Sequence, residues 1–368
     1  MALLVQNLER LDEKVKEDSD GVHNTLAIIE NTCELKSGEI CKAAGEQGLL
    51  PWLLKRIRVR QYDANKLYAS EILAILLQNN EPNQRTLGEM DGIDVLLQSL
   101  AYYKRRDPSG VDETEMMENL FDCLCSCLMF TPNRDRFLKG EGLQLMILML
   151  KEKKMSRRSA LKVLNHAMCG HEGTDNCNKF IEVYGLRSLF PAFMKPPKKS
   201  KKADTSEFEH EEHVCSIIGS LFTNAQSSLQ ERLVSKFVEN DCEKVDRLME
   251  LHFKYLQRVR NVEEQMRREK RMAASIDTDD TDEDLFLRRL DAGLFTLQQV
   301  DYIIAELCTS DARMVSSRIS TLLNQHGDSL QTVRDTLQDY AAGLGEGKDS
   351  SEAIVKQKQR LTTLVSKL

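Results

Sequence analysis

The sequence predicts an all-α fold of stacked helical repeats, and three observations lead to this fold class. Glycine (18 residues) and proline (7 residues) are scarce in a chain of 368 residues, whereas their average usage is about 7 and about 5 per cent. A β-sandwich or barrel needs turn residues about every 8–12 positions, which so few glycines and prolines cannot provide. Apolar residues recur at helical spacing, and a glycine-led pattern repeats at intervals of 44, 50 and 43 residues.

The repeated pattern is a glycine followed at once by an apolar helix. An asparagine stands nine residues before three of these glycines, as Asn133 stands before Gly142. A longer amphipathic segment completes each unit, with apolar residues spaced by three and four. Glycine suits a sharp turn with positive φ or a site of close packing, so we expect one of these before each apolar helix. The units start at Gly48, Gly92, Gly142 and Gly185, with a degenerate start at Asp241 that lacks the glycine.

A short, a medium and a long helix in units of this length are typical of armadillo and HEAT repeats, whose period is about 40–47 residues. We therefore expect an armadillo/HEAT-type right-handed solenoid over residues 1–240. The alternative, an unrelated helical array with coincidental glycines, is disfavoured by the shared asparagine offset. Residues 22–35 resemble the long helix of a unit whose start is absent, so we expect the N-terminal part of the array to be missing.

The rest of the chain divides by composition. Residues 195–206 form a basic, proline-bearing loop insertion, and residues 241–272 are predicted to be one long helix. Residues 273–284 form an acidic linker, and residues 285–368 alternate apolar helices with short polar breaks. Thr281, within the linker, precedes three acidic residues and is a candidate for an acidophilic kinase, although plain disorder is the simpler interpretation.

Overall charge and hydropathy exclude two classes of protein. The chain carries 51 basic and 58 acidic residues, a net charge of −7, so it is no general polyanion binder. Its longest strongly apolar run, residues 143–150, is far short of the roughly 18–20 residues that cross a bilayer. The N-terminus has no signal-peptide pattern. Without such a signal, the ten cysteines are interpreted as reduced, buried side chains in the cytosol or nucleus.

Motifs for catalysis, cofactors and metals are not recognisable. The glycines near Gly343 are not preceded by a strand, and Asp349 replaces the hydroxyl residue of a phosphate-binding loop. Neither Gly-x-Ser-x-Gly nor His-Glu-x-x-His occurs. The nearest approach to a metal-ligand set matches no standard zinc spacing, and ordinary packing is the preferred interpretation. It consists of His166, Cys169, His171 and Cys177. We therefore expect neither an enzyme nor a cofactor.

The third helix of each unit is the first candidate binding surface. In peptide-binding armadillo proteins an asparagine ladder on these helices holds an extended ligand by its backbone. Asn165 occupies the ladder position in one unit, whereas the others carry Ala74, Cys125 and Gly219. The sole tryptophan, Trp52, belongs to a second helix. An importin-like binding mode is therefore disfavoured.

Acidic residues near the start of the third helices, including Glu115 and Glu118, are candidates for attracting a basic peptide. Compensation of the helix dipole is the preferred interpretation of acidic residues at helix starts.

Basic residues that follow the second helices are the second candidate surface. Because they occupy equivalent places, stacking of the units would align them along one edge, as a docking strip for an acidic partner or RNA. A solvated edge is the alternative. The residues that we assign to this strip are Lys55, Arg56, Lys104, Arg105, Lys153 and Lys154.

Three segments resemble the beta-catenin-like family of armadillo-repeat proteins: residues 69–83, 129–137 and 195–202. The resemblance extends over the whole chain. It implies a non-enzymatic nuclear scaffold of the spliceosome, which supports pre-mRNA splicing by binding partner proteins, including nuclear-localisation segments of splicing factors. Activation-induced cytidine deaminase is a further partner that it implies. The alternatives are an importin-type carrier of basic peptides and an RNA-binding helical-repeat protein.

Overall fold

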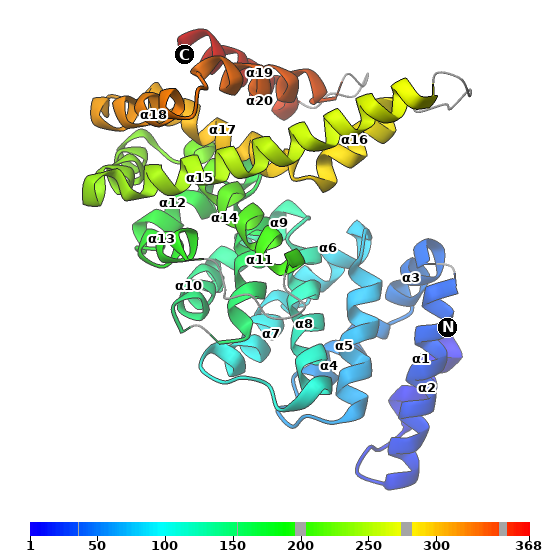
Figure 1. Ribbon diagram of the computed structural model, residues 1–368. Helices are drawn as coiled ribbons and strands as arrows, with labels where there is room; N and C mark the ends of the chain where they lie inside the picture. Colours follow the sequence, from blue (N-terminus) through cyan, green and yellow to red (C-terminus); the bar gives the residue numbers. More distant parts are fainter. Residues whose placement is uncertain (36, 153, 196–203, 274–281, 346–351) are drawn as a thin grey trace. The chain divides into compact units, whose positions relative to one another are not determined.

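The computed structural model describes residues 1–35, 37–152, 154–195, 204–273, 282–345 and 352–368, and the regular structure of these segments is entirely helical (Figure 1). The prediction of an all-α helical-repeat fold is confirmed. The chain divides into two compact units, Met1–Met168 and Cys169–Leu368. Among the described helices, none combines the length and the apolar character needed to pass through a bilayer.

The first unit stacks helices of the same kind against one another. The long third helices contact in chain order, α2 against α5, α5 against α8 and α8 against α11 (Figure 1), and the first helices α3, α6 and α9 do the same. The helices of this unit are α1 (Ala2–Arg10), α2 (Lys16–Leu35), α3 (Ser37–Glu46), α4 (Leu49–Ile57), α5 (Ala64–Leu77), α6 (Glu81–Glu89), α7 (Gly92–Leu100), η1 (Ala101–Lys104), α8 (Gly110–Cys127), α9 (Thr131–Lys139), α10 (Gly142–Glu152) and α11 (Ser156–Met168).

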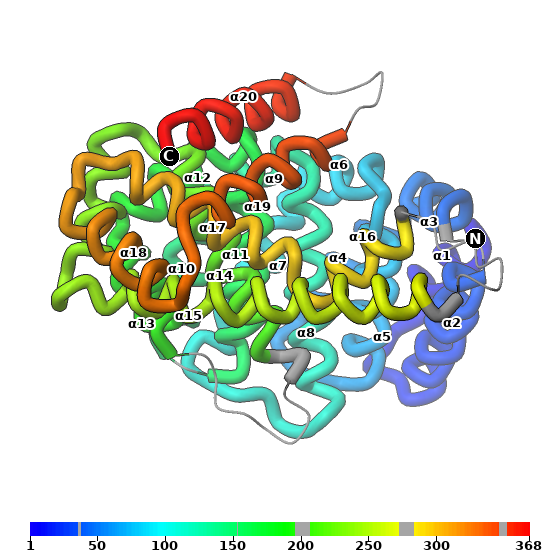
Figure 2. Tube along the Cα trace, turned by 45° about the horizontal axis from the view of Figure 1, so that its top comes forward, coloured from blue at the N-terminus to red at the C-terminus, as the bar shows by residue number. Residues whose placement is uncertain are grey.

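The second unit begins with one more repeat and continues into a helical bundle. Helices α14 and α15 both pack on α17, and α17 in turn contacts α19 and α20, which lie side by side (Figure 2). The helices of this unit are η2 (His171–Gly173), α12 (Thr174–Glu182), α13 (Leu186–Met194), α14 (Asp204–Asn224), α15 (Ser227–Ala273), α16 (Asp282–Asp291), α17 (Leu294–Cys308), α18 (Arg313–Gln325), α19 (Leu330–Gly343) and α20 (Glu352–Lys367).

The glycines at the unit starts are required for close packing more than for positive φ. Only Gly48 is left-handed, with φ of 89°. At the next start the left-handed residue is Asp91 (φ 56°), which precedes Gly92. A Cβ on Gly142 would overlap the ring of Phe137, five residues earlier. The start of α13 repeats this arrangement with another phenylalanine at the same offset. Of the two alternatives expected for these glycines, positive φ therefore applies at Gly48 and close packing at the later starts.

Two of the asparagines that precede these glycines, Asn83 and Asn133, join successive repeats. The Nδ2 atom of Asn133 donates to the Cys127 carbonyl at the end of α8 (3.1 Å) and to the Gln84 carbonyl on α6 (2.8 Å). Asn83 donates likewise to the last turn of α5 (2.8 Å) and to α3 (2.9 Å). Both asparagines are buried. The repeated asparagine is thus a structural link, because it satisfies buried carbonyls of two repeats at once.

Helix α15 contains a break at the degenerate unit start. Asn240, Asp241 and Cys242 have φ of 54°, 52° and 65°, a conformation that residues other than glycine rarely adopt. The long helix expected over residues 241–272 follows this break and continues to Ala273. The predicted end of the repeat array near residue 240 lies within the second compact unit, since the two units divide after Met168. The reason is that α14 and α15 share α17 as a packing partner, so both sides of the break belong to one core.

The two inserted segments lie largely outside the described residues. For the basic loop 195–206 this holds for residues 196–203, and α14 already begins at Asp204. For the acidic linker 273–284 it holds for residues 274–281, which include Thr281. Helix α16 begins at Asp282, earlier than expected, because acidic residues are favourable in the first turn of a helix.

Candidate functional site

A group of carboxylates on the third helices of the first unit is the candidate site. Glu71 interrupts an otherwise mostly buried stretch of α5 and is itself half-buried. Glu30 and Glu34 lie one turn apart on α2, and Glu115 lies on α8. Since α5 packs between α2 and α8, these residues come from three neighbouring helices. We call Glu30, Glu34, Glu71 and Glu115 the carboxylate cluster.

The pKa of Glu71, the central member of the carboxylate cluster, is raised by its surroundings. Burial raises the pKa of Glu71, and the neighbouring Glu30, Glu115 and Glu34 raise it further, to about 7. Like charges shift a carboxyl in this direction because they disfavour its ionised form. A cation brought by another molecule would relieve the repulsion. The arrangement is therefore chemically suited to a lysine or arginine side chain.

Carboxylates farther along α8 are already engaged by α11. Glu118 accepts a hydrogen bond from the Ser159 hydroxyl (2.6 Å), and burial raises the pKa of the Glu118 carboxyl. Lys162 forms an ion pair with Asp122 (2.8 Å). Acidic charge on this part of the face is thus compensated within the unit.

The sequence therefore located only part of the site. Of the three third-helix residues proposed, Glu115 belongs to the carboxylate cluster, Glu118 is tied to α11, and Asn165 lies half-buried on α11 itself. Sequence reasoning missed Glu30, Glu34 and Glu71. A signal for Glu71 was present, since it is a lone charged residue within an apolar third-helix segment.

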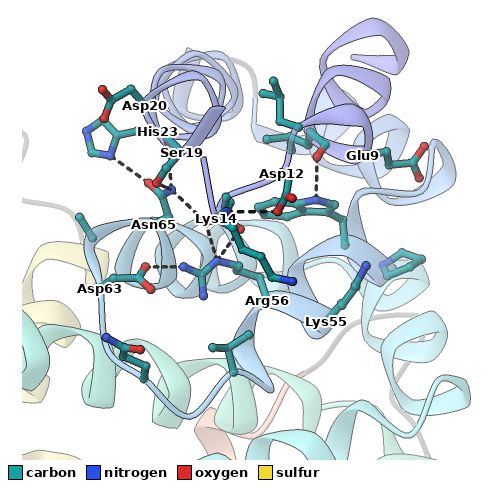
Figure 3. A pocket seen from close by; sticks show the side chains of 18 residues that line it. Glu9, Asp12, Lys14, Ser19, Asp20, His23, Lys55, Arg56, Asp63 and Asn65 are labelled. Atoms are coloured by element: carbon teal, nitrogen blue, oxygen red, sulfur yellow. Dashed lines mark hydrogen bonds and ion pairs between the residues drawn. The ribbon is translucent and has the colours of Figure 1, made fainter. Parts of the chain in front are cut away.

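Arg56 was predicted to be an exposed cation of the basic strip, but it is buried and paired with acidic residues. Its side chain is only 8% exposed, and it forms ion pairs with Glu13 (2.9 Å) and Asp63. Burial opposes protonation, but Asp63 and Glu13 outweigh it and raise the pKa of Arg56. Figure 3 shows Arg56 facing Asp63, with Lys55 to one side. Arg56 therefore joins α4, the α1–α2 connection and α5, and its guanidinium is not offered to an acidic partner.

The cavity around Arg56 is not basic. It has a volume of about 1310 Å³ and lies between the α1–α2 connection, α4 and α5 (Figure 3). Its cationic side chains are Lys14, Lys55 and Arg56. The carboxylates that line it outnumber them, being Glu9, Asp12, Glu13, Asp20 and Asp63. An anionic ligand would meet more negative than positive charge here.

The other residues of the proposed strip alternate with acidic ones. Lys55 and Lys104 are exposed. Arg105 lies 3.5 Å from Glu152, and Lys154 lies 3.2 Å from Asp107. Lys153 lies outside the described residues. Over the part of the chain that the structure describes, these cations are divided by carboxylates because the connections after the second helices carry both signs of charge.

Metal binding receives no support from the described residues. They include no group of three or more histidine, cysteine or acidic side chains placed to hold a metal ion. Cys177 is buried and its thiol donates to the Ser220 carbonyl (3.7 Å), as the packing interpretation expects.

Comparison with known proteins agrees with this architecture. The family model of catenin-beta-like, Arm-motif containing nuclear proteins matches residues 1–338. Beta-catenin-like protein 1 of Homo sapiens is 57% identical over 369 residues, covering 99% of this chain and 65% of that protein. The Schizosaccharomyces pombe homolog of beta-catenin-like protein 1 is 34% identical, covering 96% of this chain and 61% of that protein. The chain thus spans somewhat less than two-thirds of the length of these relatives.

A solved structure supports the fold class independently. The crystal structure of an engineered protein matches with a TM-score of 0.50 and 12% identity, covering 81% of this chain and 98% of that one. Fold and sequence comparisons agree, and the chain belongs to the family of catenin-beta-like, Arm-motif containing nuclear proteins.

Proposed function

We propose that this chain is a non-enzymatic scaffold of the spliceosome, acting in the nucleus. It supports pre-mRNA splicing by binding partner proteins, among them the lysine- and arginine-rich nuclear-localisation segments of splicing factors. Membership of a family described as nuclear and Arm-motif containing supports this proposal. The observation that carries the peptide-binding part is the carboxylate cluster, which gathers four acidic side chains from three packed helices. Burial and then the neighbouring carboxylates raise the pKa of Glu71 to about 7.

Activation-induced cytidine deaminase belongs to the proposed partners on the same grounds of resemblance. The importin-type alternative predicts a ladder of asparagines and tryptophans, and Asn165 alone does not make one. The RNA-binding alternative needs a continuous positive surface. It is disfavoured because Arg105 and Lys154 form ion pairs with acidic residues, which interrupt the positive charge. A protein scaffold is therefore the function that the geometry supports best.

A peptide-binding measurement tests the surface. The probe is a fluorescein-labelled peptide, Gly-Arg-Lys-Arg-Lys-Arg-Gly, and anisotropy gives its Kd for the wild-type chain and for Glu71→Gln/Glu115→Gln. We expect the double variant to bind about five- to thirtyfold more weakly, since two partly exposed ion pairs, at roughly 0.5–1 kcal/mol each, contribute about 1–2 kcal/mol together. Raising the salt concentration should reduce the difference in Kd between the wild type and the double variant, because salt screens the charges. The matched control is Glu46→Gln, an exposed residue of α3.

The cellular part of the proposal requires a second experiment. Affinity purification from nuclear extract with the wild-type chain should recover spliceosomal proteins, and Glu71→Gln/Glu115→Gln should recover fewer of those with basic segments. A folded wild-type chain that recovers transport receptors instead would favour the importin alternative. Recovery of none of the spliceosomal proteins would refute the scaffold proposal.

A further inference from the structure

The second unit holds an arginine side chain in a complete acceptor site. Arg360, on α20, donates from Nη1 to the Thr223 carbonyl (2.9 Å) and from Nη2 to the Phe222 carbonyl (2.7 Å). Its Nε and Nη2 atoms also donate to Glu306 Oε1 (3.0 and 2.7 Å). The guanidinium lies 5.9 Å from the ring centroid of Tyr302. All three nitrogen atoms of the guanidinium are thus bound.

The acceptors are positioned by helices other than α20. Phe222 and Thr223 are in the last turn of α14, whose terminal carbonyls lack partners within the helix and carry the negative end of its dipole. Glu306 accepts a hydrogen bond from the Tyr302 hydroxyl (2.6 Å), and that hydroxyl accepts one from Thr223 Oγ1 (3.0 Å). Tyr302 is 6% exposed. The site is therefore preorganised for a planar cation with several donors, which distinguishes arginine from lysine.

Apart from Arg360, α20 is held by its packing on α19 and α17 and by a hydrogen bond from Gln357 Nε2 to the Tyr340 hydroxyl (2.9 Å). Its buried residues are Leu361 and Leu364, and Lys356 forms its ion pair within the helix, with Glu352 (2.7 Å). Basic residues predominate along α20. The helix therefore presents one arginine, two leucines and additional positive charge, which are the features of a short basic ligand.

A cavity beside Arg360 leaves part of α14 uncovered. It has a volume of about 530 Å³ and is lined by α14, α17, α19 and α20 and by residues near η2. Ser216, Gly219 and Ser220 contribute the α14 side, and Gln357 contributes the α20 side. Helix α14 is the third helix of its repeat, the type of helix that carries the carboxylate cluster in the first unit. Space for a longer basic segment therefore adjoins the arginine site.

We propose that Glu306 and the Phe222 and Thr223 carbonyls form a binding site for an arginine side chain of a basic partner segment, and that α20 is an internal ligand which occupies it. This inference rests on the proposed function for the class of partner, but it concerns a separate site in the second unit. A partner arginine must displace Arg360. The apparent affinity for the partner is therefore the intrinsic affinity multiplied by the fraction of molecules in which α20 has left the site. Release of α20 is thus coupled to partner binding.

Anisotropy of the labelled peptide Gly-Arg-Lys-Arg-Lys-Arg-Gly tests the inference on the full chain. We expect Arg360→Ala to bind the peptide at least about tenfold more tightly than the wild type, because the competing side chain is gone. Adding Glu306→Gln to Arg360→Ala should abolish this gain. A peptide with lysine in place of every arginine should gain little from Arg360→Ala. Lys367→Ala, which removes a charge from an exposed position of the same helix, is the matched control and should leave the affinity unchanged.

Two outcomes would overturn the inference. One is a correctly folded Arg360→Ala chain, verified by circular dichroism and thermal unfolding, that binds no better than the wild type. The other is a gain that survives Glu306→Gln. Failure of the proposed function is separable from both, because it would appear as insensitivity to Glu71→Gln/Glu115→Gln while the dependence on Glu306 persisted.

Discussion

The amide of Asn133 occupies the space that a side chain on Gly88 would need. A Cβ atom on Gly88 would overlap the Oδ1 atom of Asn133, and Gly45 stands in the same relation to Asn83. Gly88 lies one helical turn after Gln84, whose carbonyl Asn133 binds. Each link between these repeats thus consists of an asparagine from one repeat and a glycine from the repeat before it.

Replacing Asn133 should be strongly destabilising. The side chain is fully buried, and Asn133→Ala removes the donor to two buried carbonyls at once. We expect the free energy of unfolding to fall by about 2–3 kcal/mol, measured by urea denaturation. Asn31→Ala is the control, because Asn31 is exposed and bonds only within its own helix (2.7 Å to the Ala27 carbonyl). An equal loss in both variants would contradict the role of the link.

Gly88 and Asn133 should be energetically coupled. Gly88→Ala forces an overlap with the Asn133 amide and should destabilise by about 1–3 kcal/mol, despite the better helix propensity of alanine. In Gly88→Ala/Asn133→Ala the added methyl group fits the space left by the amide, so the double variant should be more stable than the sum of the two losses predicts. A double-mutant cycle measures this difference, which we expect to exceed about 1 kcal/mol. Gly38→Ala, at a helical position with open space around the Cβ, should not destabilise.

The repeat architecture was predictable because the asparagine and glycine residues that join the repeats recur at fixed positions along the chain. The spacing between Gly92 and Gly142 and between the other unit starts gave the period, and the shared asparagine offset supported it, but neither showed that Asn133 binds two carbonyls. What could not be predicted is which distant side chains meet. Arg56 belongs to a basic cluster in the sequence, but its partner Glu13 is 43 residues earlier in the chain, and no local pattern indicates that they form a pair.

The carboxylate cluster escaped prediction for a related reason. Glu30, Glu71 and Glu115 are brought together only when α2, α5 and α8 pack in order. The helical period predicts that each helix has a polar face, but it does not determine how the polar faces of successive helices align. Glu118, one turn from Glu115, shows how sharply the environment changes, because it is engaged by Ser159 of the next helix.

The raised pKa of Glu71 makes stability depend on pH. The carboxyl loses its proton near pH 4.5 when it is unperturbed and near pH 7 in the folded chain. Between these values the folded state holds more protons, so the free energy of unfolding should fall as the pH rises from about 4.5 to about 7. Glu71→Gln removes this contribution. We expect a higher Tm than the wild type at pH 8 and little difference at pH 4, by differential scanning calorimetry.

A matched substitution separates this local effect from the overall change in charge. Glu46→Gln removes one negative charge from an exposed position of the same unit, and it should leave the pH dependence of Tm close to that of the wild type. If Glu46→Gln and Glu71→Gln raised the Tm at pH 8 equally, the stabilisation would reflect net charge and not repulsion within the carboxylate cluster.

A fully buried ion pair in the second unit gives the last prediction. His252 Nδ1 on α15 lies 2.5 Å from Asp301 Oδ1 on α17, and both side chains are 0% exposed. Among the described residues, the Nε2 atom of His252 and the Oδ2 atom of Asp301 have no hydrogen-bond partner. Burial opposes protonation of His252, but Asp301, with Asp328 adding to it and Arg260 opposing, raises its pKa above 6.5. The pair therefore stabilises fully below about pH 6.5, and its contribution is lost as the pH rises through the raised pKa.

Removing one partner of this pair should destabilise the chain more than removing both. Asp301→Leu leaves a buried imidazole without its carboxylate and should cost about 3–5 kcal/mol of unfolding free energy at pH 6. His252→Leu/Asp301→Leu replaces two desolvated and incompletely bonded groups by apolar ones, so its cost should be much smaller. Urea denaturation at pH 6 and pH 9 measures both effects. Between pH 6 and pH 9 the free energy of unfolding should fall more for the wild type than for the double variant. An equal fall in both would mean that His252 does not titrate as a partner of Asp301.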